Sequence, residues 1–288
     1  MERLKGKLSI VIPYYNNLKG LVRLLNSIPI KYVQVIVVDD NSDLNQSHVL
    51  IKDDFKGVSF YLNDSIKSNA GSARNLGLSK VSCPNVLFAD ADDYFCTDAF
   101  TYISNIIDDT FDCAYFLTDT SSDIIGFKSE RNKSYNNLVR LASESSSNLD
   151  LLRYKFHVPW SKIINMKMIT KHKISFDEVD VSNDVFFSTL VGAHSNIIKI
   201  YNKSIYCVTF NGTGLTSKSN KKNMGCRLNV AIRNNTYLMK IGVNKDLHMK
   251  TKGFFIRSDL SLFSAVGRGN IIRYLKYILR KYFMVGLK

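Results

Sequence analysis

Residues 88–95 read FADADDYF, so three carboxylates, Asp90, Asp92 and Asp93, fall within four positions directly behind an apolar run. Carboxylates this dense are costly to bury without a partner. Mg²⁺ is commonly held by one or two carboxylates together with substrate phosphates. Acids at the end of a strand could therefore form part of a metal site that a diphosphate completes. The alternative is that Asp92 or Asp93 caps the next helix while the others are solvated.

Alternating strands and helices would position these acids. Residues 7–15 and 32–43 contain continuous apolar runs typical of buried strands, and residues 17–28 between them carry leucines at helical spacing. Further strands are predicted at 57–64, 85–92 and 113–119. Helices are predicted at 72–81 and at 97–108, the latter with Thr97 as N-cap. This order predicts an α/β fold with a mostly parallel sheet flanked by helices.

Polar residues follow several of these predicted strands. Ligands of open α/β sheets bind outside the carboxyl ends of the strands, and Asp40 and Asp90 both lie at such an end. Asp40 could accept a hydrogen bond from a base N–H, or could be an ordinary turn residue. Arg74 could reach phosphates, pair with an acid or form a surface salt bridge. No GxGxxG follows the first strand and no GxxxxGK[ST] occurs, which disfavours dinucleotide-fingerprint and P-loop proteins.

Charge is distributed unevenly along the 288 residues. The net charge is +14, and residues 218–288 hold 16 Lys and Arg against two acidic residues, so the preceding chain is neutral overall. A neutral body with a basic tail suggests a binding or catalytic unit attached to a segment with an anionic partner. The five cysteines include no CxxC pair, which favours reduced thiols in the cytoplasm. Neither a signal peptide nor a membrane-spanning helix is expected.

The tail contains one amphipathic segment, GNIIRYLKYILRKYF. Ile271, Leu275, Ile278 and Tyr282 share one helical face, while basic residues lie off that face. Such a helix suits anionic lipid headgroups. The alternative is a helix packed on the rest of the protein with a charged outer face. No nucleic-acid-binding motif accompanies the charge, so a nucleic-acid partner is not expected.

Four segments taken together resemble the family-2 glycosyltransferases, whose nucleotide-sugar-binding domain has the GT-A fold. They are LSIVIPYYNN, VIVVDDNSD, NAGSARNLGL and LFADADDYF. The resemblance is strong over residues 7–120 and weaker to about residue 216. It implies a domain at 1–217, with a nucleotide-sugar-binding half at 1–120 and an acceptor-side half at 121–217. A basic, largely helical extension would occupy 218–288.

The resemblance also implies roles for donor-side residues. Pro13 and Tyr15 would line the nucleotide pocket, and Asp40 would bind the uracil ring. Arg74 would lie near the diphosphate. Within the family's DxD element, Asp92 would bind Mn²⁺ or Mg²⁺, and Asp90 would be directed at the ribose or the sugar. Asp93 is then expected to be structural.

Acceptor-side roles follow from the same resemblance. The family usually has Glu-Asp at the start of a helix, where the Asp is the catalytic base. Here the pair is Asn183-Asp184, so Asp184 is the candidate base, and the replaced Glu puts an acceptor contact in doubt. Asp184 could equally be an N-cap. Trp160 and Lys162 resemble an acceptor-site segment, although Trp160 could also be a core aromatic.

These expectations describe a metal-dependent inverting glycosyltransferase of bacterial surface polysaccharide synthesis, of the capsule, O-antigen or lipopolysaccharide type. The donor would be a UDP-sugar and the acceptor a saccharide or lipid-linked saccharide. The protein would lie in the cytoplasm, peripherally on the inner face of the cytoplasmic membrane. One alternative is a non-catalytic nucleotide-sugar-binding or scaffold protein of the same fold. Another, a nucleotidyltransferase, usually has a Gly-rich basic segment after the first strand, where this chain has PYYNN.

Overall fold

The computed structural model describes residues 1–108, 110–122, 130, 132–210, 221–251 and 272–277. Its strands are β1 (Leu8–Tyr14), β2 (Gln34–Asp39), β3 (Val58–Leu62), β4 (Asn85–Phe88), β5 (Tyr94–Phe95), β6 (Cys113–Ser122), β7 (Lys162–Asn165) and β8 (Ile198–Phe210). Its labelled α-helices are α1 (Leu18–Asn26), α2 (Ala70–Ser79), α3 (Ala99–Ile106), α4 (Lys133–Glu144), α5 (Leu149–Lys155), α6 (Met166–Lys171), α7 (Asn183–His194) and α8 (Lys221–Lys240). Short 3₁₀ turns occur at η1 (Glu2–Leu4), η2 (Leu44–Gln46), η3 (His48–Leu50), η4 (Ser146–Asn148) and η6 (Lys245–Leu247).

The strands form one sheet in the order β3-β2-β1-β4-β7-β6-β8-β5. Parallel pairings join β3, β2, β1 and β4, and also β6 and β8, whereas β7 and β5 pair antiparallel with their neighbours. The register between β6 and β8 shifts on both sides of Leu117, and such irregularities bend a strand. The predicted α/β fold with a mostly parallel sheet is therefore confirmed.

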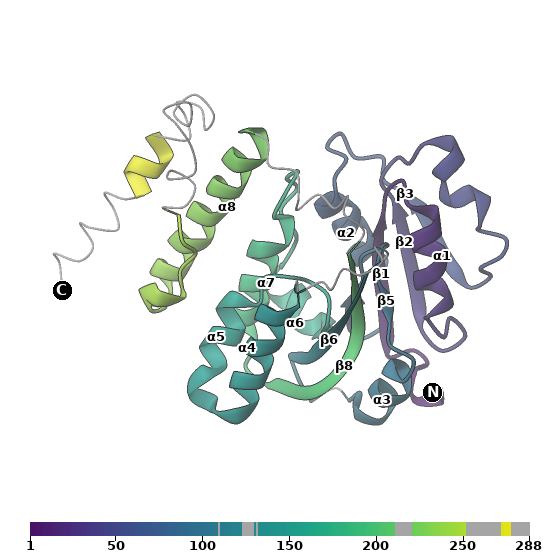
Figure 1. The fold of residues 1–288 in the computed structure, drawn as a ribbon, viewed down its shortest axis with the longest axis horizontal. Helices are drawn as coiled ribbons and strands as arrows, with labels where there is room; N and C mark the ends of the chain where they lie inside the picture. The colour runs from purple at the N-terminus through teal and green to yellow at the C-terminus, as the bar shows by residue number, and fades with distance from the viewer. Residues whose placement is uncertain (109, 123–129, 131, 211–220, 252–271, 278–288) are drawn as a thin grey trace.

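Helices cover both faces of this sheet. In Figure 1, α1 and α3 lie on one side, while α2, α7, α5 and α4 lie on the other. The residues of β1, β2 and β4 are almost all buried, as expected for parallel strands with helices on both faces. Pro13 is tolerated in this central strand because the β4 pairing of β1 ends at Val11, two residues earlier.

Two local predictions differ from the structure. Strand β4 ends at Phe88, so the acids of FADADDYF lie in a turn that leads to the two-residue strand β5. Neither Asp92 nor Asp93 therefore caps a helix. The N-cap of α3 is Asp98 and not Thr97, because the Asp98 carbonyl accepts the first helical bond, from Tyr102 N at 2.9 Å. β5 is too short for any periodicity to predict it.

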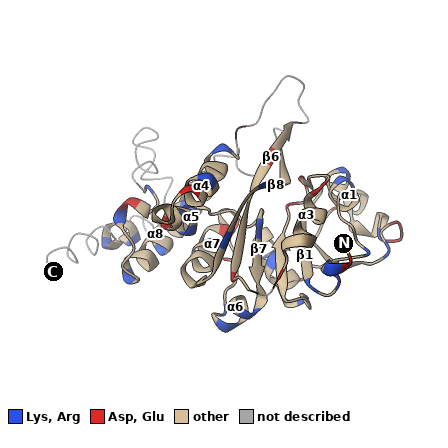
Figure 2. Ribbon diagram, turned by 90° about the horizontal axis from the view of Figure 1, so that it is seen from below, with Lys and Arg blue, Asp and Glu red and all other residues tan. Residues whose placement is uncertain are grey.

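The C-terminal part packs on the rest of the protein through α8, which lies beside α7 (Figure 1). Leu238 and Leu247 form a small apolar cluster with Tyr154 of α5. Residues 272–277 are helical, and Tyr277 is buried, with its hydroxyl 3.1 Å from Asn235 Nδ2. The rest of the predicted amphipathic helix lies outside the described residues. Figure 2 shows basic residues at several positions of α8. Among the described residues, no helix is long and apolar enough to cross a membrane.

Candidate active site

The carboxyl ends of β1, β2 and β3 are joined by backbone hydrogen bonds. Asp40 N donates to Tyr14 O, and Asn63 N donates to Asp39 O, both at 2.8 Å. The Asp40 carboxylate accepts hydrogen bonds from Asn63 Nδ2 and, at 2.7 Å, from Ser68 Oγ. Both bonds use Oδ1, which leaves Oδ2 able to accept from a ligand.

The residues predicted for the nucleotide pocket lie at this same edge of the sheet. Pro13 is half-buried within β1, and Tyr15 follows β1 with 60% of its surface exposed. Asn16 and Asn41 have positive φ angles of 46° and 64°, and this region is accessible to Asn at lower cost than to most residues. An aromatic ring, a proline and a carboxylate thus lie at one edge of the sheet, and their role in nucleotide binding stays a prediction.

The α2 helix brings Arg74 to the acidic stretch. Its start is fixed by a capping box, in which the Asn69 side chain accepts from Gly71 N and Ser72 N while Ser72 Oγ accepts from Asn69 N. Arg74 is buried, and its Nη2 lies 2.6 Å from Asp90 Oδ1. Ion pairs of this kind, with a carboxylate accepting a charge-assisted bond, are short and directional.

The same guanidinium reaches the start of α7, because Arg74 Nη1 donates to Asn183 Oδ1 at 2.7 Å. Two segments more than 90 residues apart in the chain thereby meet at one side chain. Arg74 was predicted to lie near a diphosphate. In the structure, its described contacts are with Asp90, Asn183 and the ring of Phe176, 5.4 Å from the guanidinium carbon.

The three acids of FADADDYF occupy different environments. Asp90 is half-buried and paired with Arg74, and Asp93 is buried and accepts a hydrogen bond from Thr209 N at 2.7 Å. Burial raises the pKa of Asp93 well above its usual range, and the negative charges of Asp92 and Asp90 raise it further. Asp92 is half-buried, and its backbone carbonyl accepts from the Arg23 guanidinium. Asp93 thus occupies the structural position expected for it.

The acidic turn has the donor set that a divalent cation prefers, since carboxylate oxygens are its usual protein ligands. Burial is the main cause of the raised pKa of Asp93, and the charges of Asp92 and Asp90 add to it; a cation bound at this turn would favour the ionised carboxylates. Among the described residues, no group of three His, Cys, Asp or Glu side chains gathers to hold a metal. The predicted site needs fewer protein ligands, because a diphosphate would complete it.

Asp184 lies in the first turn of α7, where the helix dipole favours negative charge. The N-cap is Ser182, not Asp184, and it has φ 60° with no side-chain cap. Burial raises the pKa of Asp184, an effect that the Arg74 guanidinium partly reverses. A carboxylate with a raised pKa is a better proton acceptor near neutral pH than an ordinary aspartate.

The two predicted acceptor residues are buried. Trp160 is 3% exposed; its ring stacks on Tyr206 at a centroid distance of 5.9 Å and meets Tyr135 edge-on at 5.4 Å. Trp160 is therefore a core aromatic, which was the alternative to an acceptor-binding role. Lys162 is 0% exposed, and its Nζ donates to Phe156 O at 3.0 Å. Burial lowers the pKa of Lys162 to about 8.

Sequence patterns did not indicate several residues that organise this region. Arg23 of α1 contacts the Asp92 carbonyl, and Tyr206 of β8 accepts a hydrogen bond from Asp90 N at 2.8 Å. His48 Nδ1 lies 2.7 Å from Asp39 Oδ2. The partners in each contact are at least nine positions apart in the chain and share no helical or strand periodicity, so no local pattern could have predicted them.

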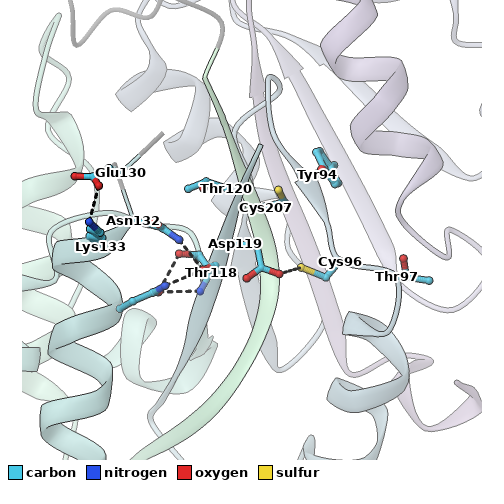
Figure 3. Close-up of a pocket in the computed structure, with 11 residues that line it drawn as sticks. Tyr94, Cys96, Thr97, Thr118, Asp119, Thr120, Glu130, Asn132, Lys133 and Cys207 are labelled. Atoms are coloured by element: carbon cyan, nitrogen blue, oxygen red, sulfur yellow. Dashed lines mark hydrogen bonds and ion pairs between the residues drawn. The ribbon is translucent and has the colours of Figure 1, made fainter. Parts of the chain in front are cut away.

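A cavity of about 660 Å³ lies near the ends of β6 and β8 (Figure 3) and shares no lining residue with the predicted site. Cys96 Sγ donates to Asp119 Oδ2 at 3.8 Å across it, and Lys133 pairs with Glu130 at its rim. Burial, together with the Asp119 carboxylate, raises the pKa of Cys96 to about 12. The thiol is therefore protonated and is not an activated nucleophile.

Comparison with known proteins identifies a family for the chain. The sequence model described as "Glycosyl transferase family 2" matches residues 9–169. Poly(ribitol-phosphate) beta-N-acetylglucosaminyltransferase TarS of Staphylococcus aureus is 24% identical over 211 residues, which is 69% of this chain and 35% of that protein. The chain thus spans about a third of the length of this curated relative.

Solved structures have the same fold. Residues 1–349 of S. aureus TarS in complex with UDP-GlcNAc superpose with a TM-score of 0.64 at 18% identity, over 94% of this chain and 79% of that one. A mannosyltransferase from Pyrobaculum calidifontis, in complex with GDP-Man and Mn²⁺, gives a TM-score of 0.54 at 12% identity, over 90% and 72% of the two chains. The fold is the GT-A type.

Proposed function

Because the chain belongs to glycosyl transferase family 2, we propose that it transfers a sugar from a UDP-sugar to a hydroxyl group of a saccharide or lipid-linked acceptor. The observation that carries the proposal is the position of Arg74, which bonds to Asp90 and to the first turn of α7. The Arg74 guanidinium thus links the acidic turn, which we propose binds the donor, to the helix that carries the proposed base.

On the donor side, the uracil ring would donate an N–H to Asp40, with Pro13 and Tyr15 lining the pocket. Asp90 would be directed at the ribose or the sugar, held by its ion pair with Arg74. Asp92 would hold Mn²⁺ or Mg²⁺. When bound, such an ion neutralises the negative charge that develops on a leaving diphosphate.

On the acceptor side, Asp184 takes the proton of the acceptor hydroxyl as the hydroxyl oxygen attacks the anomeric carbon. The new carbon–oxygen bond forms opposite the bond to the diphosphate, which breaks with its electron pair leaving on the phosphate oxygen. Configuration at the anomeric carbon therefore inverts. The Arg74 guanidinium lies close enough to Asp184 to reverse part of the rise in its pKa that burial causes. The same guanidinium is ion-paired with Asp90.

The setting we propose is assembly of a bacterial surface polysaccharide of the capsule, O-antigen or lipopolysaccharide type, on the cytoplasmic side of the membrane. The relative TarS is named for transfer to poly(ribitol-phosphate), which supports a polymer with free hydroxyl groups as the acceptor. The positive charge of residues 218–288 supports an anionic surface as partner. Ile272 and Leu275 are 53% and 54% exposed, which leaves apolar side chains available to a lipid interface.

A thermal-shift panel of UDP-, GDP- and dTDP-sugars, each with and without Mn²⁺, tests the donor. We expect a metal-dependent rise in melting temperature with one UDP-sugar. Release of UDP on addition of a panel of octyl glycosides then tests transfer, and proton NMR of the product tests inversion. UDP-sugar binding without UDP release from any acceptor would instead indicate a non-catalytic binding protein.

A further inference from the structure

Helix α8 contacts the loop that precedes the proposed base. The loop spans residues 177–182 and leads directly into α7. Arg233 of α8 forms an ion pair with Asp177 at the start of the loop, and Cys226 Sγ donates to Val181 O at 3.4 Å near its end. The Arg233 guanidinium carbon also lies 4.1 Å from the centroid of the Phe186 ring on α7. One helix of the basic extension therefore holds both ends of this loop.

The other side of the same loop is held by α2, the helix that carries Arg74. Asn75 exchanges two hydrogen bonds with the Phe176 backbone, at 2.8 and 3.0 Å. Gly71 has no room for a side chain, because a Cβ there would lie 2.1 Å from Asp177 O. Asp177 N donates to Asn183 O at 3.2 Å, which closes the loop onto the first residue of α7.

The start of α7 depends on these contacts. Ser182 adopts a left-handed conformation with φ 60° and makes no side-chain cap, so the usual local stabilisation of a helix N-terminus is missing. A residue in this region costs free energy and persists only where surrounding contacts hold it. The surrounding contacts here come from Arg74 on one side and from α8 on the other.

We propose that Arg233 is a positioning residue, which holds the 177–182 loop against α2 and thereby sets the orientation of Asn183 and Asp184 relative to Arg74 and Asp90. This inference rests on the proposed function. It makes α8 part of the catalytic unit, although its sequence places it in the basic extension. The buried Asp177 carboxylate is the group through which Arg233 acts.

The test substitutes Arg233→Met, which removes the ion pair while keeping an apolar chain over Phe186. We expect kcat for UDP release to fall about tenfold to 100-fold, because small misplacements of reacting groups have effects of this size. KM and the thermal shift for the UDP-sugar should stay unchanged, because the contacts of Arg233 with Asp177 and Phe186 include none of the residues proposed to bind the donor. Arg233→Lys keeps the charge and should restore part of the lost kcat.

Lys240→Met is the matched control, because it removes an exposed cation from the last turn of the same helix. It should behave as the wild type. Asp177→Asn should lower kcat as Arg233→Met does, and the double variant should be no worse than either single variant, since both changes break one pair.

Three outcomes separate the possibilities. If the wild type binds a UDP-sugar but releases no UDP with any acceptor, the proposed function fails. If the wild type is active and Arg233→Met keeps its kcat, the positioning inference alone fails. A fall in melting temperature with kcat and donor binding lost together would also overturn it; should Arg233→Met not fold, Arg233→Lys and Asp177→Asn carry the same comparison.

Discussion

Acidic residues lie at the ends of two neighbouring regions of the sheet, and the buried acid of each end, Asp39 or Asp93, has a different environment. Asp39 is the last residue of β2, and Asp93 lies in the turn after β4; both are almost fully buried. Burial would raise the pKa of Asp39, but hydrogen bonds from His48 and Ser42 outweigh it, so the pKa is lowered. The pKa of Asp93 is raised by burial and by Asp92 and Asp90.

The difference shows that burial alone does not decide the state of an acid. Asp39 has several donors around it, including Ser42 N at 2.8 Å and His48 Nδ1 at 2.7 Å. Asp93 has the Thr209 amide and two like charges. The buried acid of the β2 end is therefore surrounded by hydrogen-bond donors, whereas the buried acid of the β4 end lies beside two further carboxylates. The following predictions test this contrast.

The largest effect is expected for Asp92→Ala. If the β4 end binds a cation, this change should lower transfer about 100-fold or more, because a metal supplies several kcal/mol of charge stabilisation. The metal-dependent part of the thermal shift with UDP should disappear. Asp40→Ala, at the β2 end, should weaken UDP binding about tenfold with or without metal. Full activity of Asp92→Ala would remove the metal site from the proposal.

An effect of comparable size is expected at the proposed base, whose pKa is influenced by Arg74 and Asp90. Asp184→Asn should lower kcat by about 10²–10⁴ while leaving UDP-sugar binding intact. Because burial raises the pKa of Asp184, the acid limb of the wild-type kcat profile should lie above the usual range of an aspartate. Measurement of kcat against pH for UDP release checks both points. Unchanged turnover in Asp184→Asn would require another base.

Stability should distinguish the two buried acids directly. Asp39→Asn should lower the free energy of unfolding by about 2 kcal/mol at pH 7, because charged acceptors of several hydrogen bonds are lost. Asp93→Asn should change it by less than about 1 kcal/mol, since repulsion is relieved while an amide oxygen can still accept from Thr209 N. Urea unfolding measures both. Equal losses in the two variants would contradict the contrast.

The same two acids should affect the pH dependence of stability with opposite signs. The lowered pKa of Asp39 gives a stabilising contribution that is present above its unfolded pKa, about 3.9, and is lost as pH falls through the folded value. The raised pKa of Asp93 gives a contribution that is present at low pH and is lost as pH rises through the folded value. In Asp93→Asn, the free energy of unfolding should therefore fall less steeply as the pH is raised. In Asp39→Asn, it should fall less steeply as the pH is lowered.

The smallest effect is expected for Lys162→Met. Lys162 is a buried cation on β7, the strand next to β4. Burial lowers the pKa of Lys162, and the charge of Asp184 offsets part of that decrease. A pKa of about 8 corresponds to a penalty of about 3 kcal/mol for keeping the ammonium charged, offset by its bond to Phe156 O. Replacing a buried charge with an apolar chain is often neutral or stabilising. The melting temperature should stay the same or rise, with UDP release unchanged; a loss of UDP release would contradict this prediction.

The sequence predicted the strand-end placement of Asp40 and Asp90, because apolar runs ending in polar residues identify strands and their ends without tertiary information. The resemblance also put the Asn183-Asp184 pair at the start of a helix, and α7 begins there. The sequence did not predict that Trp160 and Lys162 would be buried, since an aromatic and a lysine in a turn-rich segment are compatible with either surface or core. The capping of α3 by Asp98 was missed because two adjacent polar residues, Thr97 and Asp98, are both good caps.

By itself, the sequence determined the α/β class, the order of the acidic strand ends and the basic character of residues 218–288, because each depends on residue type and on short-range periodicity. Only the tertiary structure decided which acid became paired, which became buried and which helix borders the proposed base. Arg74 meets Asp90 and Asn183, and Arg233 meets Asp177, across separations of 16 to 109 residues. Folding brings these partners together from distant parts of the chain, so no local pattern encodes them.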